Sequence, residues 1–186
     1  MTNEIQKCIQ VLKAGGIILY PTDTVWGIGC DATNEDAVKK VYQLKQRDDA
    51  KSLIILVAND AMLNKHVKEV PELAWDLIDI SNSPTTIIYE GAQNLAKNVI
   101  AQNGSIAIRM VKDNFCHQLV YNYRKPIVST SANISNSPTP LSFNEIGEEI
   151  KNAVDFIVSP NFEYGNPKPS SLIQLGMNGE IQILRK

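Results

Sequence analysis

Three short segments of this 186-residue sequence combine side chains that could bind a polyphosphate. The segment 44–53 contains Lys45, Arg47 and Lys51. An arginine offers a planar fork to phosphate and a lysine offers a mobile point charge. Residues two apart on one helix point to different faces, so Lys45 and Arg47 converge only if the chain leaves the helix between or just after them. From this segment alone, cations that complement a helix C-terminus remain the alternative.

The segment 126–138 is a short apolar strand followed by a dense row of hydroxyl and amide side chains. Ser129, Ser131 and Asn133 occupy alternate positions, so they share one face if the chain stays extended. Neutral donors on one face could hold phosphate oxygens beside the cations. A polar turn is the alternative here.

The segment 20–30 places hydroxyls, an acid, an aromatic and two glycines where a strand ends at Pro21. Such a strand end can present Thr22 and Thr24 in a crevice beside a sheet. The alternative is a turn in which Thr and Asp side chains bond their own backbone.

The elements that must position these segments follow from apolar runs and helical periodicity. Strand-length apolar runs occur at residues 16–20, 53–58, 85–89, 105–110, 126–130, 154–158, 171–175 and 180–184. Helical patterns occur at 5–13, 33–44, 71–80, 114–123 and 143–150. Strands that alternate with helices predict an α/β fold. Residues 135–142 and 159–170 are rich in Pro, Asn and Ser and predict long surface loops.

Length and composition limit the class of protein. A chain of 186 residues with 44% hydrophobic content predicts one domain spanning residues 1–186. The net charge of −2 gives no global attraction for nucleic acid or anionic membrane, so an anion site must be local. His66 and His117 stand outside any zinc motif, and no phosphate-loop or dinucleotide-binding motif is present. The N-terminus lacks a long apolar stretch, so we expect a cytoplasmic protein without a membrane partner.

The order and spacing of these segments resemble the YrdC-like family of threonylcarbamoyl-AMP synthases in its short, single-domain form. The matching pieces span nearly the whole chain: GGIILYPTDTVWGIGCDA, VYQLKQRDDAKSLIILVAN, SIAIRM, PIVSTSANISNSP, GNPKPSSLIQL and ILR. The resemblance implies a twisted, mostly mixed sheet flanked by helices with a large concave cavity. It also implies a nucleotidyltransferase that forms threonylcarbamoyl-AMP and pyrophosphate from ATP, L-threonine and bicarbonate or CO2, for modification of adenosine in tRNA.

The resemblance further implies which residues act. The Lys-x-Arg and Ser-x-Asn pairs, here Lys45, Arg47, Ser131 and Asn133, would be catalytic and bind ATP. Lys51, Thr139 and Arg185 would approach the nucleotide, while Thr24, Arg109, Ser129 and Ser170 would approach threonine. We expect Mg2+ to bind through ATP phosphates and not through a protein cage. Implied partners are tRNA threonylcarbamoyl transferase proteins and, as a candidate, tRNA itself.

Three departures from the family pattern are visible. Asp48 and Asn82-Ser83-Pro84 stand where the family usually has Pro and Pro-Gly-Pro, and Asn136 replaces a frequent glycine. Because Pro fixes φ and Gly readily adopts a positive φ, replacing them with Asp, Asn or Ser bears on loop shape. Two other functions stay open: a non-catalytic RNA-binding module and a paralogue with different carbamoyl chemistry. The acidic charge balance and few aromatics weigh against the first.

Overall fold

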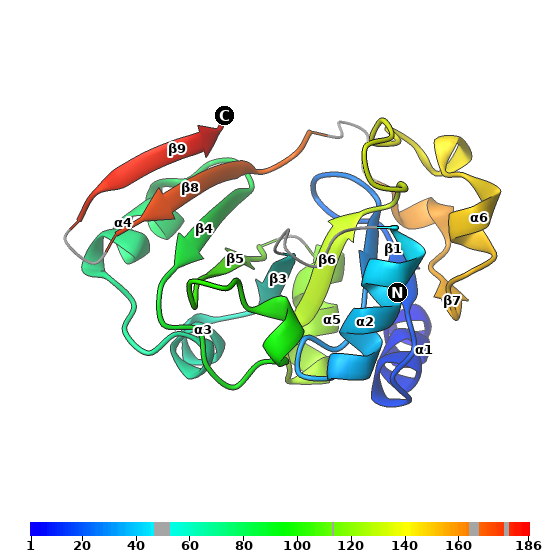
Figure 1. Cartoon of the computed structure of the whole chain (residues 1–186). Helices are drawn as coiled ribbons and strands as arrows, with labels where there is room; N and C mark the ends of the chain where they lie inside the picture. Colours follow the sequence, from blue (N-terminus) through cyan, green and yellow to red (C-terminus); the bar gives the residue numbers. More distant parts are fainter. Residues whose placement is uncertain (47–52, 113, 164–167, 177–178) are drawn as a thin grey trace.

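A single sheet of nine strands runs through the computed structural model (Figure 1), which describes residues 1–46, 53–112, 114–163, 168–176 and 179–186. The strand order is β7-β1-β2-β6-β3-β5-β4-β8-β9. The strands are β1 (Ile18–Tyr20), β2 (Gly27–Gly29), β3 (Ile54–Val57), β4 (Thr85–Tyr89), β5 (Ile106–Met110), β6 (Ile127–Ser131), β7 (Phe156–Ile157), β8 (Ser171–Leu175) and β9 (Ile181–Arg185). The sheet contains both parallel pairs, such as β3 with β5, and antiparallel pairs, such as β4 with β5. The sheet is therefore mixed, as expected.

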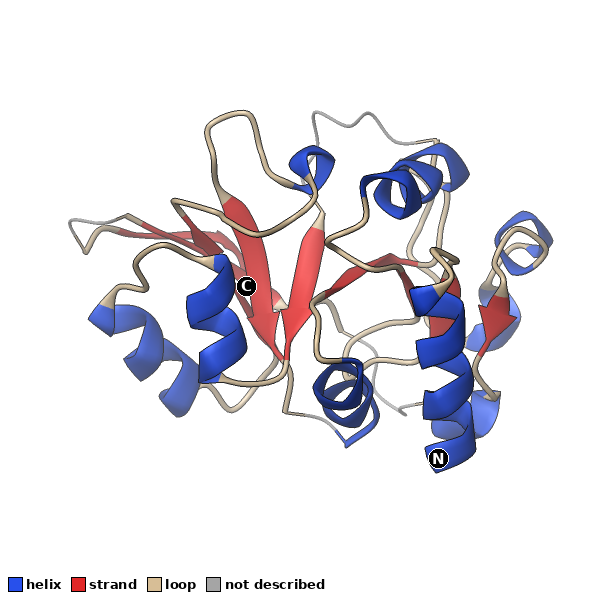
Figure 2. Cartoon of the chain, turned by 90° about the horizontal axis from the view of Figure 1, so that it is seen from below, coloured by secondary structure: helices blue, strands red, loops and turns tan. Residues whose placement is uncertain are grey.

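Within the described residues six α-helices flank the sheet, and Figure 2 shows helices on both sides of the strands. They are α1 (Thr2–Lys13), α2 (Glu35–Leu44), α3 (Asp60–His66), α4 (Glu72–Ile80), α5 (Asn114–Tyr123) and α6 (Glu148–Lys151), with 3₁₀ helices at Lys97–Val99, Phe143–Glu145 and Pro160–Phe162. None of the helices described is long and apolar enough to span a membrane. The layered architecture confirms the predicted α/β class.

Strand alternation divides the core into two apolar clusters on opposite faces of the sheet. In β3, Leu56 packs with residues of α1 and α5, whereas Ile55 and Val57 pack with residues of α2, α3 and α4. Alternate side chains of a strand point to opposite faces, which explains the division. The helix α2 starts where Asn34 accepts hydrogen bonds from the backbone N–H groups of Asp36 and Ala37, which confirms the helical pattern predicted at 33–44.

The sequence prediction missed or misjudged three elements. It omitted β2, where glycine is required because a Cβ on Gly29 would lie 2.7 Å from both the Tyr20 ring and the Val128 carbonyl oxygen. It omitted the short helix α3. The single helix predicted at 143–150 was wrong, since the 3₁₀ turn Phe143–Glu145 and α6 are separate and Gly147 caps the latter.

Candidate functional site

A cavity of about 310 Å³, here called the arginine cavity, lies against one face of β3, β4, β5 and β6 and is completed by β8 and β9. The strand residues that floor it are Ile54, Ile88, Ala107, Ser129 and Leu172. Seven of the residues predicted to form the site also line it: Thr24, Arg109, Ser129, Ser131, Thr139, Ser170 and Arg185. The fold thus brings residues from distant parts of the sequence to one place.

Arg109 is the most deeply buried cation of the arginine cavity, with only 4% of its surface exposed. It lies on β5, and its Nη1 donates to Thr24 Oγ1 at 3.0 Å. Its Nη2 lies 3.1 Å from Asp23 Oδ1. Among the described residues, Arg109 Nε has no hydrogen-bond partner. The guanidinium is therefore oriented by two neighbours from the β1–β2 loop and keeps a donor available for an anion.

Arg185 brings a second guanidinium to the same cavity from β9. Its Nε donates to the Ser170 carbonyl oxygen at 2.8 Å, and its Nη2 donates to Ser170 Oγ at 3.3 Å. The Ser170 hydroxyl also contacts Thr86 Oγ1 at 2.8 Å. Partial burial, together with the nearby charge of Arg109, lowers the pKa of Arg185. Both arginines stay charged at neutral pH, so they create a local positive field in a chain of net charge −2.

Lys45 lies at the C-terminal cap of α2, directly before Gln46, whose φ of 48° takes the chain out of the helix. The chain thus turns where the convergence of Lys45 and Arg47 would require it. Lys45 is 1% exposed and does not line the arginine cavity. Its Nζ donates to the carbonyl oxygens of Ser131 at 2.5 Å and Asn133 at 2.6 Å. The ammonium therefore fixes the backbone that follows β6.

The residues after β6 do not stay extended. The Asn133 N–H donates to the Ser131 carbonyl oxygen at 2.9 Å, and the Asn133 amide nitrogen donates to the carbonyl oxygens of Ile134 and Ser137 at 2.9 and 2.7 Å. Hence Ser129 and Ser131 line the cavity and Asn133 does not. Asn136 adopts a φ of 67°, the left-handed region that glycine favours and asparagine tolerates. This departure from the family pattern keeps the local backbone conformation that a glycine would take.

Two predicted site residues, Arg47 and Lys51, lie outside the described part of the chain, as does Asp48. The sequence prediction assigned no role to Asp23 or Thr86, which contact Arg109 and Ser170. Thr86 could have been found from strand alternation, because its hydroxyl lies on the same face of β4 as Ile88, which lines the cavity. No local sequence signal could have paired Asp23 with Arg109, because the two are far apart in the sequence. Thr24, the residue next to Asp23, is 85 positions from Arg109.

Comparison with known proteins supports this architecture. Residues 10–186 match the Sua5, YciO and YrdC family, whose description reads "Telomere recombination". A protein of Pseudoalteromonas translucida named threonylcarbamoyl-AMP synthase is 34% identical over 180 residues, which cover 95% of each chain. The match extends over almost the full length of both proteins.

Solved structures show the same fold. A double variant of P. abyssi Sua5 superposes with a TM-score of 0.86 at 27% identity, covering 97% of this chain and 55% of that one. P. abyssi Sua5 complexed with L-threonine superposes with a TM-score of 0.82 at 27% identity, covering 92% of this chain and 50% of that one. This chain thus spans about half the length of the Sua5 structures. By its sequence match over residues 10–186, the chain belongs to the Sua5, YciO and YrdC family.

Proposed function

We propose that this protein is an L-threonylcarbamoyladenylate synthase, which forms threonylcarbamoyl-AMP and pyrophosphate from L-threonine, bicarbonate or CO2, and ATP. The observation that carries the proposal is the arginine cavity, where Arg109 and Arg185 face hydroxyl groups of Thr24, Ser129 and Ser131. Cations and hydroxyls suit a reaction in which anions must be aligned and neutralised. The names of the relatives and the threonine complex of Sua5 support the same activity.

The proposed reaction needs no nucleophile from the protein. The neutral amine of threonine adds CO2 and loses one proton to solvent, which gives an N-carboxylate, and an oxygen of that carboxylate attacks the α-phosphorus of ATP. The bond between the α-phosphorus and the oxygen that bridges to the β-phosphorus breaks, and pyrophosphate leaves with the electron pair. The protein aligns attacking and leaving groups and stabilises their charge, as in other phosphoryl-transfer sites. No Cys, His or Lys occurs among the described residues that line the cavity, which fits a protein that aligns the substrates and forms no covalent bond to them.

The threonine end of the site is proposed to centre on Arg109. Its available Nε and its fork geometry suit the threonine carboxylate. The hydroxyls of Thr24, Ser129 and Ser170 are placed to read the remaining polar groups of threonine. Each of these four residues is less than 9% exposed, so the contacts would form away from bulk water, where electrostatic interactions are stronger.

The nucleotide end is proposed to comprise Lys45, Arg47, Lys51, Ser131, Asn133, Thr139 and Arg185. Within this set the buried ammonium of Lys45 shapes the turn after β6, while Ser131, Thr139 and Arg185 face the cavity. The catalytic contribution of Lys45 and Asn133 would then depend on how they hold this backbone.

Mg2+ is proposed to enter with ATP. The described residues that line the arginine cavity include no carboxylate, which fits an ion held by phosphate oxygens and water. When bound, Mg2+ would neutralise charge on the phosphates.

We further propose that the reaction takes place in one domain of residues 1–186 and in the cytoplasm. We assign the adenylate to tRNA threonylcarbamoyl transferase proteins, with tRNA as a further candidate partner.

The test is pyrophosphate release by the purified protein with ATP, Mg2+, bicarbonate and L-threonine, each omitted in turn, and with L-alanine as the control amino acid. Release that requires both threonine and bicarbonate is expected. If release is absent while the protein is folded and binds ATP, the activity is refuted and a paralogue with different carbamoyl chemistry is favoured. Binding of RNA that weakens steeply with salt in the absence of ATP would instead indicate an RNA-binding module.

A further inference from the structure

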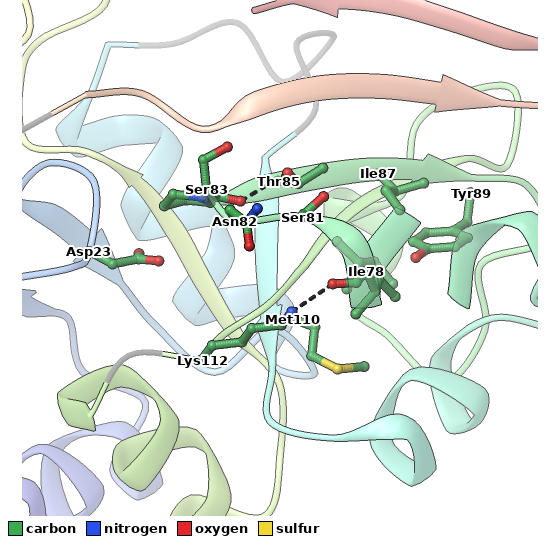
Figure 3. A pocket seen from close by; sticks show the side chains of 12 residues that line it. Asp23, Ile78, Ser81, Asn82, Ser83, Thr85, Ile87, Tyr89, Met110 and Lys112 are labelled. Carbon is green, nitrogen blue, oxygen red and sulfur yellow. Dashed lines mark hydrogen bonds between the residues drawn. The ribbon is translucent and has the colours of Figure 1, made fainter. Parts of the chain in front are cut away.

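A second cavity, of about 350 Å³, lies on the opposite face of the sheet from the arginine cavity. The arginine cavity contacts Ile88, Ala107 and Arg109, whereas this second one contacts the alternate residues Ile87, Ile108 and Met110 of the same strands. Because alternate residues of a strand face opposite sides, β4 and β5 separate the two cavities. We call the second one the tyrosine cavity, and Figure 3 shows its lining. It is lined by Asp23, Ile78, Ser81, Asn82, Ser83, Pro84, Thr85, Ile87, Tyr89, Ile108, Met110 and Lys112.

One wall and the floor of the tyrosine cavity are apolar. Ile78 of α4 faces the strand residues Ile87, Ile108 and Met110. Aliphatic side chains and a methionine thioether pack well against a flat or apolar molecular body, and the sulfur adds a favourable contact with an aromatic ring. The cavity volume falls within the range of small-molecule sites.

Tyr89 supplies a polar group inside this apolar region. The residue is only 2% exposed, yet it lines the cavity, and Figure 3 shows its hydroxyl directed toward Ile78. Within the described residues this hydroxyl has no hydrogen bond, and its oxygen is not fully buried. It is therefore accessible from the cavity and available to a ligand atom.

The charged groups around the tyrosine cavity already have partners. Asp23 pairs with Arg109 at 3.1 Å, and Lys112 Nζ donates to the Ile78 carbonyl oxygen at 2.6 Å. Ser81 Oγ and Thr85 Oγ1 donate to backbone carbonyl oxygens at 2.5 and 3.0 Å. The groups that remain available among the described residues are neutral: the hydroxyls of Ser83 and Tyr89 and the amide of Asn82. A neutral ligand therefore fits this lining better than an ion.

We propose that the tyrosine cavity binds a neutral heteroaromatic molecule of about nucleoside size. Its ring would lie against Ile78, Ile87 and Met110 and accept or donate one hydrogen bond at the Tyr89 hydroxyl. The Asn82 amide carries a donor and an acceptor side by side, which match the edge of a base. This site is separate from the proposed reaction in the arginine cavity, so either proposal can fail without the other.

The experiment titrates adenosine into protein labelled with ¹³C at the methionine methyl groups, with ATP and Mg2+ present to occupy any nucleotide site in the arginine cavity. The Met110 methyl reports on the tyrosine cavity, and Met62, which packs in the core outside it, is the internal control. The variant Met110→Leu assigns the signal. Saturable movement of the Met110 signal is expected, and no movement up to the solubility limit of adenosine would overturn the proposal.

Matched variants separate binding from general damage. Tyr89→Phe removes only the hydroxyl and should weaken adenosine binding about fivefold, the value of one hydrogen bond. Tyr121→Phe, the same change at a residue that is 57% exposed, should have no effect. Ile78→Ser should weaken binding and Ile80→Ser, on the same helix but 70% exposed, should not. Equal affinity in Tyr89→Phe and wild type, or tighter binding of AMP than of adenosine, would refute the neutral-ligand assignment.

Discussion

The arginine cavity and the turn after β6 use cations in different ways. At the turn, Lys45 is 1% exposed and donates to two backbone carbonyl oxygens, so its charge holds the turn in place. In the cavity, Arg109 of β5 and Arg185 of β9 belong to the lining itself, and partial burial together with the charge of Arg109 lowers the pKa of Arg185. The difference teaches that a cation in a site can act by shaping the backbone or by presenting its charge. Substitutions should separate these two actions.

The largest effect is expected at Arg109. The change Arg109→Lys keeps the charge but removes the fork that contacts both Thr24 and Asp23. We expect kcat/KM for threonine to fall by about 10²-fold, the order of the loss of one preorganised electrostatic donor. Threonine-dependent pyrophosphate release measures it, and Arg124→Lys, an exposed position on the surface, is the control. A loss of twofold or less at Arg109 would refute its role in threonine binding.

Lys45 should show a combined effect on activity and stability. The change Lys45→Met leaves the carbonyl oxygens of Ser131 and Asn133 without the ammonium. Adenylate formation should fall about tenfold or more, with a loss of about 1–3 kcal/mol in the free energy of unfolding. Lys39→Met, at an exposed position of α2, is the control in both pyrophosphate and denaturant assays. If activity is lost while stability is kept, Lys45 contacts substrate and does not shape the turn.

Arg185 should show the opposite pattern. Because β9 is exposed along its length and the Arg185 side chain contacts mainly Ser170, Arg185→Met should leave the free energy of unfolding within about 0.5 kcal/mol of wild type. The KM for ATP should rise about tenfold, as expected for one lost charged contact. Steady-state kinetics and urea unfolding measure the two quantities, with Lys186→Met as the control. A large loss of stability would show that Arg185 mainly holds the strand.

Asp31 lies outside the lining of the arginine cavity, so its substitution should change stability without changing activity. Burial alone would raise its pKa, but hydrogen bonds from Lys125, Thr33 and Tyr123 outweigh burial and hold the pKa below its ordinary value. A carboxyl group with a lowered folded-state pKa stabilises the fold above its unfolded pKa of about 3.9. Asp31→Asn should therefore cost about 1–3 kcal/mol at neutral pH.

The pH dependence provides the decisive measurement for Asp31. The difference in unfolding free energy between wild type and Asp31→Asn should be full at neutral pH and shrink as the pH falls below about 4. Urea unfolding across this range measures it, and Asp79→Asn, at an exposed position of α4, is the control. A difference that does not depend on pH would mean that the carboxylate charge contributes nothing to stability.

Much of the fold was predictable because its elements carry local signals. Apolar runs with β-branched residues predicted eight strands, and the helical pattern at 33–44 predicted α2. The strand β2 could not be predicted, because two of its three residues are glycines, which have low strand propensity, and Gly29 is required by the close approach of the Val128 carbonyl oxygen. The helix α3 has only seven residues, too few for a clear helical period.

The sequence predicted which residues belong to the candidate site better than it predicted the contacts between them. Ser129 was identified from the polar row that follows a strand and Arg109 from the resemblance to the YrdC-like family, and the sheet brings the two together. The bonding of Lys45 to two carbonyl oxygens depends on where the turn after β6 passes, which no local pattern specifies. The pairing of Asp23 with Arg109 likewise depends on contacts between distant segments.

The position of Arg185 on β9 has a consequence for the working temperature of the protein. This strand lies at the edge of the sheet, pairs only with β8 among the described residues and is exposed at every position. Segments with few buried contacts open locally at lower free energy than the core. Local opening of β9 would remove one guanidinium from the cavity while the core stays folded. Hydrogen exchange should therefore be fastest along this strand, and activity should decline on heating before cooperative unfolding begins.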